Sequence, residues 1–245
     1  MNWMKCLILM GVLCGGIISG EAADDSPKKR TRIVLVGDST VTDQAGWGSG
    51  FAACFDERVE CLNLAAGGRS SKSYRTEGRW DKVLRTGADY VLLQFGHNDQ
   101  PGKGPERETE PETTYRANMQ RYVEEARAAG MQPVLVTSLT RRQFNKAGKI
   151  ESTLTPYAVV VADLAAKLKV PLIDLHTLSI AAAEQAGPEK CKEYSPETVD
   201  RPDVTHLNAE GSLWMGQLVA SRLIQVVPPL AESYRPAGTA NSPER

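Results

Sequence analysis

The sequence predicts an α/β fold, a three-layer α/β/α sandwich in which helices cover both faces of a five-stranded parallel sheet. Short apolar runs rich in β-branched residues alternate along the chain with segments of helical periodicity. The runs are continuously apolar, which is typical of strands buried on both faces. With 245 residues, 41% of them hydrophobic, the chain is long and apolar enough for one large domain.

Five strands are predicted, one from each apolar run. They span residues 33–37, 62–65, 90–95, 133–138 and 171–175. Parallel strands need crossover connections, so helices are expected between them. In such sheets ligands bind outside the carboxyl ends of the strands, and the residues directly after each run are therefore the candidate functional ones.

Six helices are predicted, over residues 47–55, 79–85, 114–129, 156–168, 175–186 and 208–226. The segment 114–129 has the clearest periodicity, because Tyr115, Met119 and Tyr122 fall on one face. Gly130 follows where a left-handed helix stop is expected. The last helix is expected to end before Pro228, since proline cannot continue it.

The N-terminus has the pattern of a secretory signal peptide over residues 1–22. Lys5 precedes an apolar core that runs from Cys6 to Ile18, and small residues follow. This core is shorter than the roughly 20 residues that cross a bilayer, so we expect cleavage and export, to the periplasm or outside the cell, without stable membrane insertion afterwards. The rest is expected to divide into a linker (23–32), one folded domain (33–227) and a Pro-rich, partly disordered tail (228–245).

The net charge and the cysteine content bear on three questions: nucleic-acid binding, disulfide bonds and metal sites. The formal net charge of -1 provides no excess of positive charge for nucleic acid. After signal removal Cys54, Cys61 and Cys191 remain, an odd number. A bridge between Cys54 and Cys61 stays open, although a domain of this size favours buried thiols. No CxxC or His-rich spacing is present, and no metal site or cofactor is predicted.

Ser39 is the first candidate functional residue, in the segment Gly-Asp-Ser-Thr after the first predicted strand. A serine on a strand-to-helix turn exposes its hydroxyl at the sheet edge, and its backbone N–H lies near a positive helix end that stabilises developing negative charge. Ser39 is therefore a candidate nucleophile. An N-cap serine with no catalytic role is the alternative.

Two further turns hold candidate hydrogen-bond donors. The turn after the second strand contains Gly67 and Gly68, and glycine lets a bare backbone N–H approach a ligand closely. The turn after the third strand contains Asn98, whose side-chain amide could donate to the same oxygen. Each segment alone is equally compatible with an ordinary turn.

Asp203 and His206 lie on one loop before the last predicted helix. A serine nucleophile needs a base to accept its proton, and the base needs an acceptor that fixes its tautomer. Asp203 and His206 could supply both from a single segment.

These four blocks resemble those of the SGNH (GDSL-like) hydrolases, and they appear as Ser39 in GDST, a glycine in AAGGRS, Asn98 in GHND and His206 in DVTH. The resemblance runs from about residue 33 to residue 226. Within that superfamily, GDST, Gly-Trp-Gly at 46–48, GGRSSKSYRTEGRW and FGHNDQ are similar to rhamnogalacturonan acetylesterases.

The resemblance implies a flavodoxin-like sandwich and a secreted carbohydrate esterase that removes acetyl groups from a pectic polysaccharide or oligosaccharide. It implies Ser39 as nucleophile, His206 as base and Asp203 as its orienting partner. The implied oxyanion hole consists of the Ser39 and Gly68 amides and the Asn98 side chain. No metal or organic cofactor is implied.

Three other interpretations stay open. A two-metal phosphoesterase would use Asp38, Asp43, Asp99 and His206, but an upstream Asp-x-His and paired C-terminal histidines are missing. A non-catalytic glycan-binding protein is disfavoured because nucleophile, base and orienting partner are all present. A lipase, a thioesterase or an esterase of acetylated xylan shares the chemistry, and the polar loops 70–79 and 101–113 argue against a lipid site.

Several other side chains have both a functional and a structural interpretation. His97 could orient a loop or contact substrate, or be structural, and His176 is predicted to be structural. Trp47 and Trp80 are expected in the core rather than stacked on a sugar. Five basic residues could meet galacturonate carboxylates or could be solvated surface charges, namely Arg69, Lys72, Arg75, Arg141 and Arg142.

Overall fold

Five parallel strands form one sheet in the order β2-β1-β3-β4-β5, within the residues that the computed structural model describes, which are 1, 29–199 and 201–236. The strands are β1 (Thr31–Gly37), β2 (Val59–Asn63), β3 (Tyr90–Gln94), β4 (Gln132–Val136) and β5 (Leu172–Ile173). The α/β fold with a five-stranded parallel sheet is thus confirmed, and the strand order is flavodoxin-like. Because the order reverses at β1, the carboxyl ends of β1 and β3 lie side by side.

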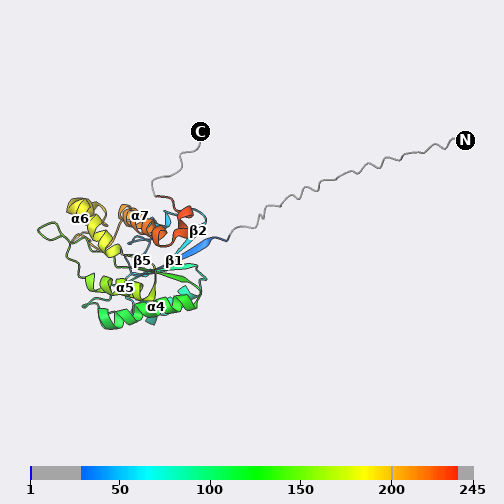
Figure 1. Ribbon diagram of the computed structural model, residues 1–245. Helices are drawn as coiled ribbons and strands as arrows, with labels where there is room; N and C mark the ends of the chain where they lie inside the picture. The colour runs from blue at the N-terminus through cyan, green and yellow to red at the C-terminus, as the bar shows by residue number, and fades with distance from the viewer. Residues whose placement is uncertain (2–28, 200, 237–245) are drawn as a thin grey trace.

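Helices cover both faces of the sheet (Figure 1). α4 (Arg116–Ala128) and α5 (Thr155–Leu168) lie on one face, and α1 (Gly48–Ala52) and α7 (Ala209–Val226) lie on the other. The remaining elements are α2 (Ser73–Thr76), α3 (Arg79–Leu84), the π-helical turn η1 (Pro111–Tyr115), α6 (Leu175–Glu193) and the 3-10 helix η2 (Pro228–Ser233).

The strands contribute side chains to two separate hydrophobic cores, because successive side chains of a strand point to opposite faces of the sheet. Val34 and Val91, which are register partners, pack in the layer of α4 and α5. Leu35 and Leu92, the next pair, pack in the layer of α7. All four side chains are almost completely buried, so the central strands hold the sheet between two apolar layers.

Several predicted boundaries are wrong. β2 spans 59–63 rather than 62–65, because it is an edge strand with half-buried residues such as Glu60 and lacks the continuous apolar pattern of a central strand. α6 continues to Glu193 across a kink at Gly187, where the backbone leaves helical geometry before Pro188. α2 and η2 were not predicted, because helices this short carry too few residues for a periodic pattern.

The described parts of the linker and the tail are ordered elements. β1 begins at Thr31, inside the predicted linker. In the predicted tail, η2 buries Leu230, and Tyr234 forms an antiparallel bridge with Phe55. Both ends of the described domain therefore meet at one turn, because Thr31 N–H also donates to the carbonyl of Arg58.

The predicted signal peptide lies outside the described residues, apart from Met1. Across the described stretches, no helix is both long and apolar enough to cross a membrane. Cys54, Cys61 and Cys191 are thiols, and Cys54 and Cys191 are buried.

Candidate active site

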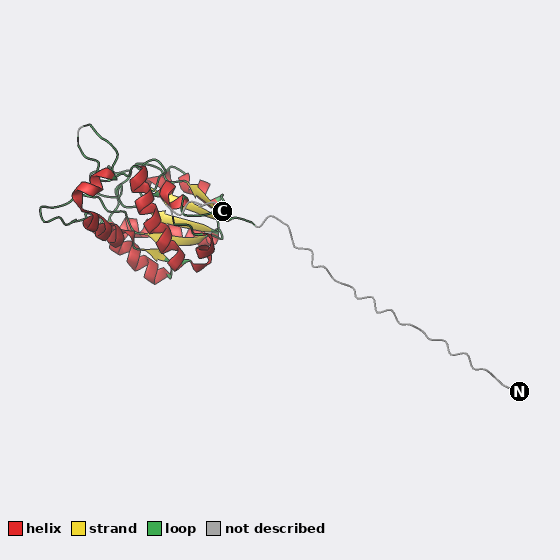
Figure 2. Cartoon of the chain, turned by 90° about the horizontal axis from the view of Figure 1, so that it is seen from above, coloured by secondary structure: helices red, strands yellow, loops and turns green. Residues whose placement is uncertain are grey.

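Polar turns follow β1 and β3 at the point where the strand order reverses. Ser39 comes directly after Asp38 at the end of β1, and Asn98 lies in the turn after β3. This is the crevice in which open α/β sheets bind their ligands. Figure 2 shows long loops projecting from the end of the sheet that lies away from the entry of the chain into β1.

Ser39, His206 and Asp203 form a continuous hydrogen-bonded row. His206 Nε2 lies 2.9 Å from Ser39 Oγ, and His206 Nδ1 lies 2.8 Å from Asp203 Oδ2. Asp203 Oδ1 accepts from the backbone N–H groups of Thr205 at 2.8 Å and of His206 at 2.9 Å. The structure thus brings Ser39 together with Asp203 and His206, which lie on one loop, His206 being 167 residues further along the chain than Ser39.

The surroundings of Asp203 favour its ionised form. Burial raises the pKa of this carboxyl group, but hydrogen bonds from the backbone and ring of His206 and from the backbone of Thr205 outweigh it, so the pKa lies below its ordinary value. An ionised carboxylate only accepts hydrogen bonds, so His206 Nδ1 is the donor. Nε2 of the neutral ring is then free to accept a proton from the Ser39 hydroxyl.

Arg142 holds the loop that carries Asp203 and His206. Its guanidinium donates to the carbonyl of His206 at 2.5 Å, to that of Asp203 at 3.4 Å and to Ser195 Oγ at 2.8 Å. Its backbone N–H donates to the carbonyl of Val204 at 2.7 Å. Arg142 is only 5% exposed, so its guanidinium is neither a solvated surface charge nor open to a sugar carboxylate, the two alternatives that the sequence offered. Sequence reasoning missed the structural role because backbone carbonyls leave no motif.

A buried polar chain fixes the turn that carries Ser39. Trp47 Nε1 donates to Gln94 Oε1 at 2.9 Å, Gln94 Nε2 donates to Thr40 Oγ1 at 2.7 Å, and Thr40 Oγ1 donates to Asp38 Oδ1 at 2.7 Å. Burial raises the pKa of Asp38, but His97 and Thr40 outweigh it and the pKa lies below its ordinary value. Gln94, at the polar end of an otherwise apolar strand, is a second residue that sequence reasoning missed.

Of the predicted oxygen-binding donors, Asn98 lines the cleft together with Ser39, and Gly67, the neighbour of Gly68, lies against Ser39, because a Cβ added at Gly67 would be 3.6 Å from Ser39 Cβ. Asn98 Nδ2 donates to the carbonyl of Arg69 at 3.2 Å, and the side chain faces the cleft beside Ser39. Gly68 adopts a φ of 77°, a conformation that favours glycine. The preceding carbonyl, that of Gly67, accepts from Arg69 Nη1 at 2.7 Å. Because a trans peptide directs its N–H opposite to its C=O, the Gly68 N–H points away from that guanidinium.

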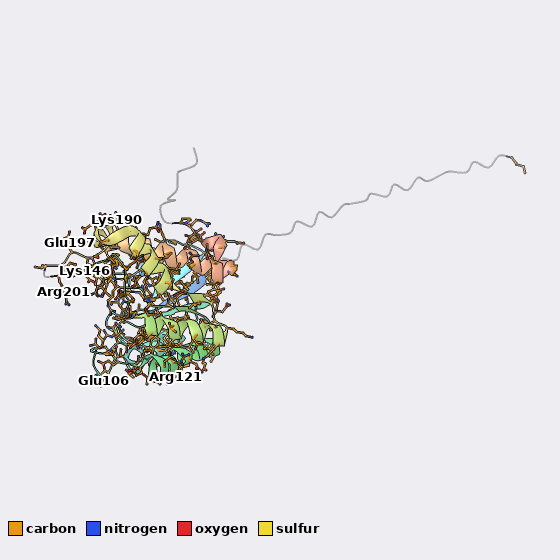
Figure 3. All side chains as sticks on the ribbon, turned by 60° about the vertical axis from the view of Figure 1, so that its left-hand side comes forward. Glu106, Arg121, Lys146, Lys190, Glu197 and Arg201 are labelled. Atoms are coloured by element: carbon orange, nitrogen blue, oxygen red, sulfur yellow. The ribbon has the colours of Figure 1, made fainter. Side chains whose placement is uncertain are left out.

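A polar cleft of about 750 Å³ opens in front of Ser39 and His206. Three cationic side chains line it, those of Lys103, Arg141 and Arg201. Lys103, Arg141 and Gln143 also line a second hollow of about 620 Å³, so the two form one groove. Figure 3 shows Lys146 and Arg201 at the same end of the molecule.

The histidines and tryptophans have distinct places. His97 is 4% exposed, with Nδ1 3.6 Å from Asp38 Oδ2, and it borders the cleft. His176 is structural as predicted, because its ring contacts the carbonyl of Ser138 and the hydroxyl of Thr155. Trp47 and Trp80 are buried, in agreement with their predicted core position.

The other basic residues that could meet a sugar carboxylate are mostly engaged elsewhere. Arg69 pairs with Glu77, and Arg75 pairs with Glu125 at 2.9 Å and lies over the ring of Tyr122. Lys72 Nζ donates to the carbonyl of Pro105. Arg141 is the member of the predicted set that lines the cleft.

The residues of the two-metal interpretation do not converge. Asp43 accepts from Asn63 Nδ2, whereas Asp99 accepts from Ser71 and Thr109. Throughout the described ranges, no group of three or more His, Cys, Asp or Glu side chains is arranged to hold a metal ion.

Comparisons with known proteins find one hydrolase family and relatives named as acetylesterases. The sequence matches the model of the GDSL-like Lipase/Acylhydrolase family over residues 35–213. It is 37% identical over 223 residues to rhamnogalacturonan acetylesterase RhgT of Bacillus subtilis (strain 168), which covers 84% of this chain and 94% of RhgT. It is 36% identical over 209 residues to the probable rhamnogalacturonan acetylesterase YesY of the same organism, which covers 82% of this chain and 96% of YesY. The crystal structure of YxiM from Bacillus subtilis aligns with a TM-score of 0.69 at 28% identity, over 80% of this chain and 56% of YxiM.

Proposed function

The chain belongs to the GDSL-like lipase/acylhydrolase family, and on that premise we propose that it is a serine acetylesterase that removes acetyl groups from a pectic polysaccharide, rhamnogalacturonan. Two relatives at 36% and 37% identity over most of the chain carry that activity in their names. The observation that carries the proposal is the row from Ser39 through His206 to Asp203, with contacts of 2.9 and 2.8 Å.

The first half of the proposed reaction forms an acyl-enzyme. Ser39 Oγ attacks the acetyl carbonyl carbon while His206 Nε2 accepts the hydroxyl proton. The C–O bond to the sugar then breaks, and His206 returns the proton to the leaving sugar oxygen. Asp203 keeps Nδ1 protonated and stabilises the imidazolium that forms between these steps.

The second half releases acetate. Water attacks the acetyl carbonyl of the acyl-enzyme, His206 accepts a proton from the water, and the bond to Ser39 Oγ breaks as that oxygen is reprotonated. In both halves the negative charge on the carbonyl oxygen is stabilised by the amides of Ser39 and Gly68 and the side chain of Asn98. These steps need no metal ion or organic cofactor.

The groove supports a carbohydrate substrate, and the signal-peptide pattern supports export. A groove lined by polar and charged side chains suits a carbohydrate better than an acyl chain of a lipid. The signal-peptide pattern over residues 1–22 supports export to the periplasm or the cell exterior, where polysaccharide is met.

The test is acetate release from acetylated rhamnogalacturonan, acetylated xylan and p-nitrophenyl esters of increasing acyl length, by the parent and by Ser39→Ala. The parent should prefer the pectic substrate and the shortest ester, and Ser39→Ala should lower kcat by at least ~10⁴-fold. Ser221→Ala, which removes a hydroxyl on α7 that donates to the carbonyl of Leu218, is the matched control and should keep parental activity. Near-parental turnover by Ser39→Ala would remove this residue from the role, and a preference for xylan or for long acyl chains would overturn the substrate.

A further inference from the structure

Arg141 differs from most arginines of the described chain in what its guanidinium contacts. Arg32, Arg58, Arg75, Arg79, Arg116 and Arg121 each pair with a carboxylate. Arg141 donates one long hydrogen bond, from Nη1 to Thr153 Oγ1 at 3.3 Å, and no described carboxylate lies within ion-pair distance of it. A guanidinium has five N–H donors, so most of its capacity is unused.

The unused N–H donors of Arg141 lie beside the groove that contains Ser39. Its side chain is half-buried, and it lines both the hollow that contains Ser39 and the neighbouring hollow. Burial lowers the pKa of Arg141, opposed by the charge of Asp38, but the guanidinium stays protonated because the ordinary pKa of arginine lies far above neutral pH. A partly desolvated cation with few partners is costly, and an anion in the groove would offset that cost.

The charge of the groove is opposite in sign to that of the chain. Lys103, Arg141 and Arg201 line the Ser39 hollow, where the one acidic side chain, Asp203, is engaged by His206. The second hollow contains Lys103 and Arg141 again and one carboxylate, that of Glu110. The positive charge is therefore concentrated at the junction of the two hollows, in a chain whose formal net charge is -1.

We propose that Arg141, assisted by Lys103, binds the carboxylate of a uronic-acid residue that neighbours the acetylated sugar residue in the polymer. The two hollows, of about 750 and 620 Å³, are each within the usual size of a ligand site, so the groove holds consecutive sugar residues. The planar guanidinium matches the two oxygens of a carboxylate. This inference rests on the proposed function for the position of the cleaved ester.

The test compares an acetylated oligosaccharide that contains galacturonate with the same oligosaccharide after reduction of its carboxyl groups to alcohols. The parent should have a higher kcat/KM for the acidic form, and Arg141→Gln should lower the ratio of the two kcat/KM values roughly 10- to 100-fold, toward one. Glutamine can still donate to Thr153 Oγ1, and an unchanged Tm would show an intact fold. Lys146→Gln, which removes an exposed cation from the next turn of the same loop, should leave the ratio unchanged.

A second measurement separates this inference from the proposed function. Direct titration of Ser39→Ala with galacturonate oligosaccharide should show binding that weakens with salt, and adding Arg141→Gln should abolish most of the binding and of its salt dependence. This measurement is independent of ester cleavage, so a parent that releases no acetate would defeat the proposed function alone. The subsite would be overturned by a parent that does not distinguish acidic from reduced oligosaccharide, or by Arg141→Gln that lowers both kcat/KM values equally or not at all.

Discussion

Among single residues, Arg142 links the fold to the site, because its guanidinium bonds to carbonyls of the loop that carries Asp203 and His206. Lysine would keep the charge but lose the fork that reaches these groups together. We therefore expect Arg142→Lys to lower kcat about 10-fold or more and to leave KM nearly unchanged, because the ring of His206 loses its fixed position. Steady-state kinetics measure this effect. Arg222→Lys, at a site on α7 that donates to Gln225, is the control, and equal effects of both changes would contradict the role of Arg142.

Asn98 tests the proposed oxygen-binding site. Its amide lies beside Ser39 in the cleft, and a donor of this kind acts on the charge that develops in the transition state. Asn98→Ala should therefore lower kcat by roughly 10²- to 10³-fold with little change in KM. Kinetics on a p-nitrophenyl ester give both constants, and a change limited to KM would identify a ground-state contact instead.

The candidate catalytic and oxygen-binding residues could be predicted from the sequence, but the residues that position them could not. Ser39, Asn98, Asp203 and His206 stand in short motifs at predicted strand ends or in one loop. Arg141 and Arg142 are adjacent identical residues, and no local pattern shows that one side chain lines the groove while the other lies under the loop. The different places of Arg141 and Arg142 depend on segments far away in the sequence that pack over one side chain and not over the other.

Among the elements, α1 and α7 cross at unusually close range. A Cβ atom added at Gly216 would lie far inside van der Waals contact with backbone atoms of Gly50 and Phe51. Gly216→Ala should therefore lower the free energy of unfolding by about 1–3 kcal/mol, because backbone atoms cannot move aside as a flexible side chain can. Leu213→Ala, at a position of α7 that is 41% exposed, should change stability by less than about 0.5 kcal/mol. Denaturant unfolding compares the two, and a parental midpoint for Gly216→Ala would show that the helices can separate.

Long elements could be predicted from their periodicity, as for α4, α5 and α7. Short or edge elements could not. β2 is half-buried, and α2 has a single turn, so neither carries enough residues to show a period above the noise of local composition. The kink in α6 follows from Gly187 and Pro188, yet its continuation to Glu193 depends on packing against α7.

For the whole molecule, the pH dependence of stability has an identifiable contributor in Asp99. Burial raises its pKa to about 7, in spite of hydrogen bonds from Ser71 and Thr109. Since the unfolded carboxyl group titrates near 3.9, the folded state holds the extra proton between these values, and stability falls as the pH rises from about 4 to 7. Asp99→Asn cannot ionise, so the variant should lack this contribution.

The measurement is the difference in unfolding free energy between Asp99→Asn and the parent across that pH range. It should move in favour of the variant with rising pH, by on the order of 4 kcal/mol at most. Asp163→Asn is the control, because hydrogen bonds from Lys167 and Arg116 lower the pKa of Asp163, so this group is ionised in both states above about pH 4 and its difference should stay nearly flat across the range. A pH-independent difference for Asp99→Asn would show that Asp99 is ionised throughout.

The layer arrangement of the whole molecule could be predicted, because continuous apolar strands can only be covered on both faces. The order β2-β1-β3-β4-β5 agrees with the flavodoxin-like sandwich that the family resemblance implies. The apolar pattern alone contains no information on which strands are neighbours. The groove depends on loops from several strands and could not be predicted from any one segment.

The meeting of both ends of the described domain at residues 55–58 has a practical meaning. Thr31 and Tyr234 lie at the amino edge of the sheet, opposite Ser39. A fusion partner or a solid support joined at Thr31 or Tyr234 would therefore lie on the side of the protein opposite Ser39. A bulky substrate, such as the polysaccharide of the proposed function, can then still reach the cleft that contains Ser39 from the opposite side.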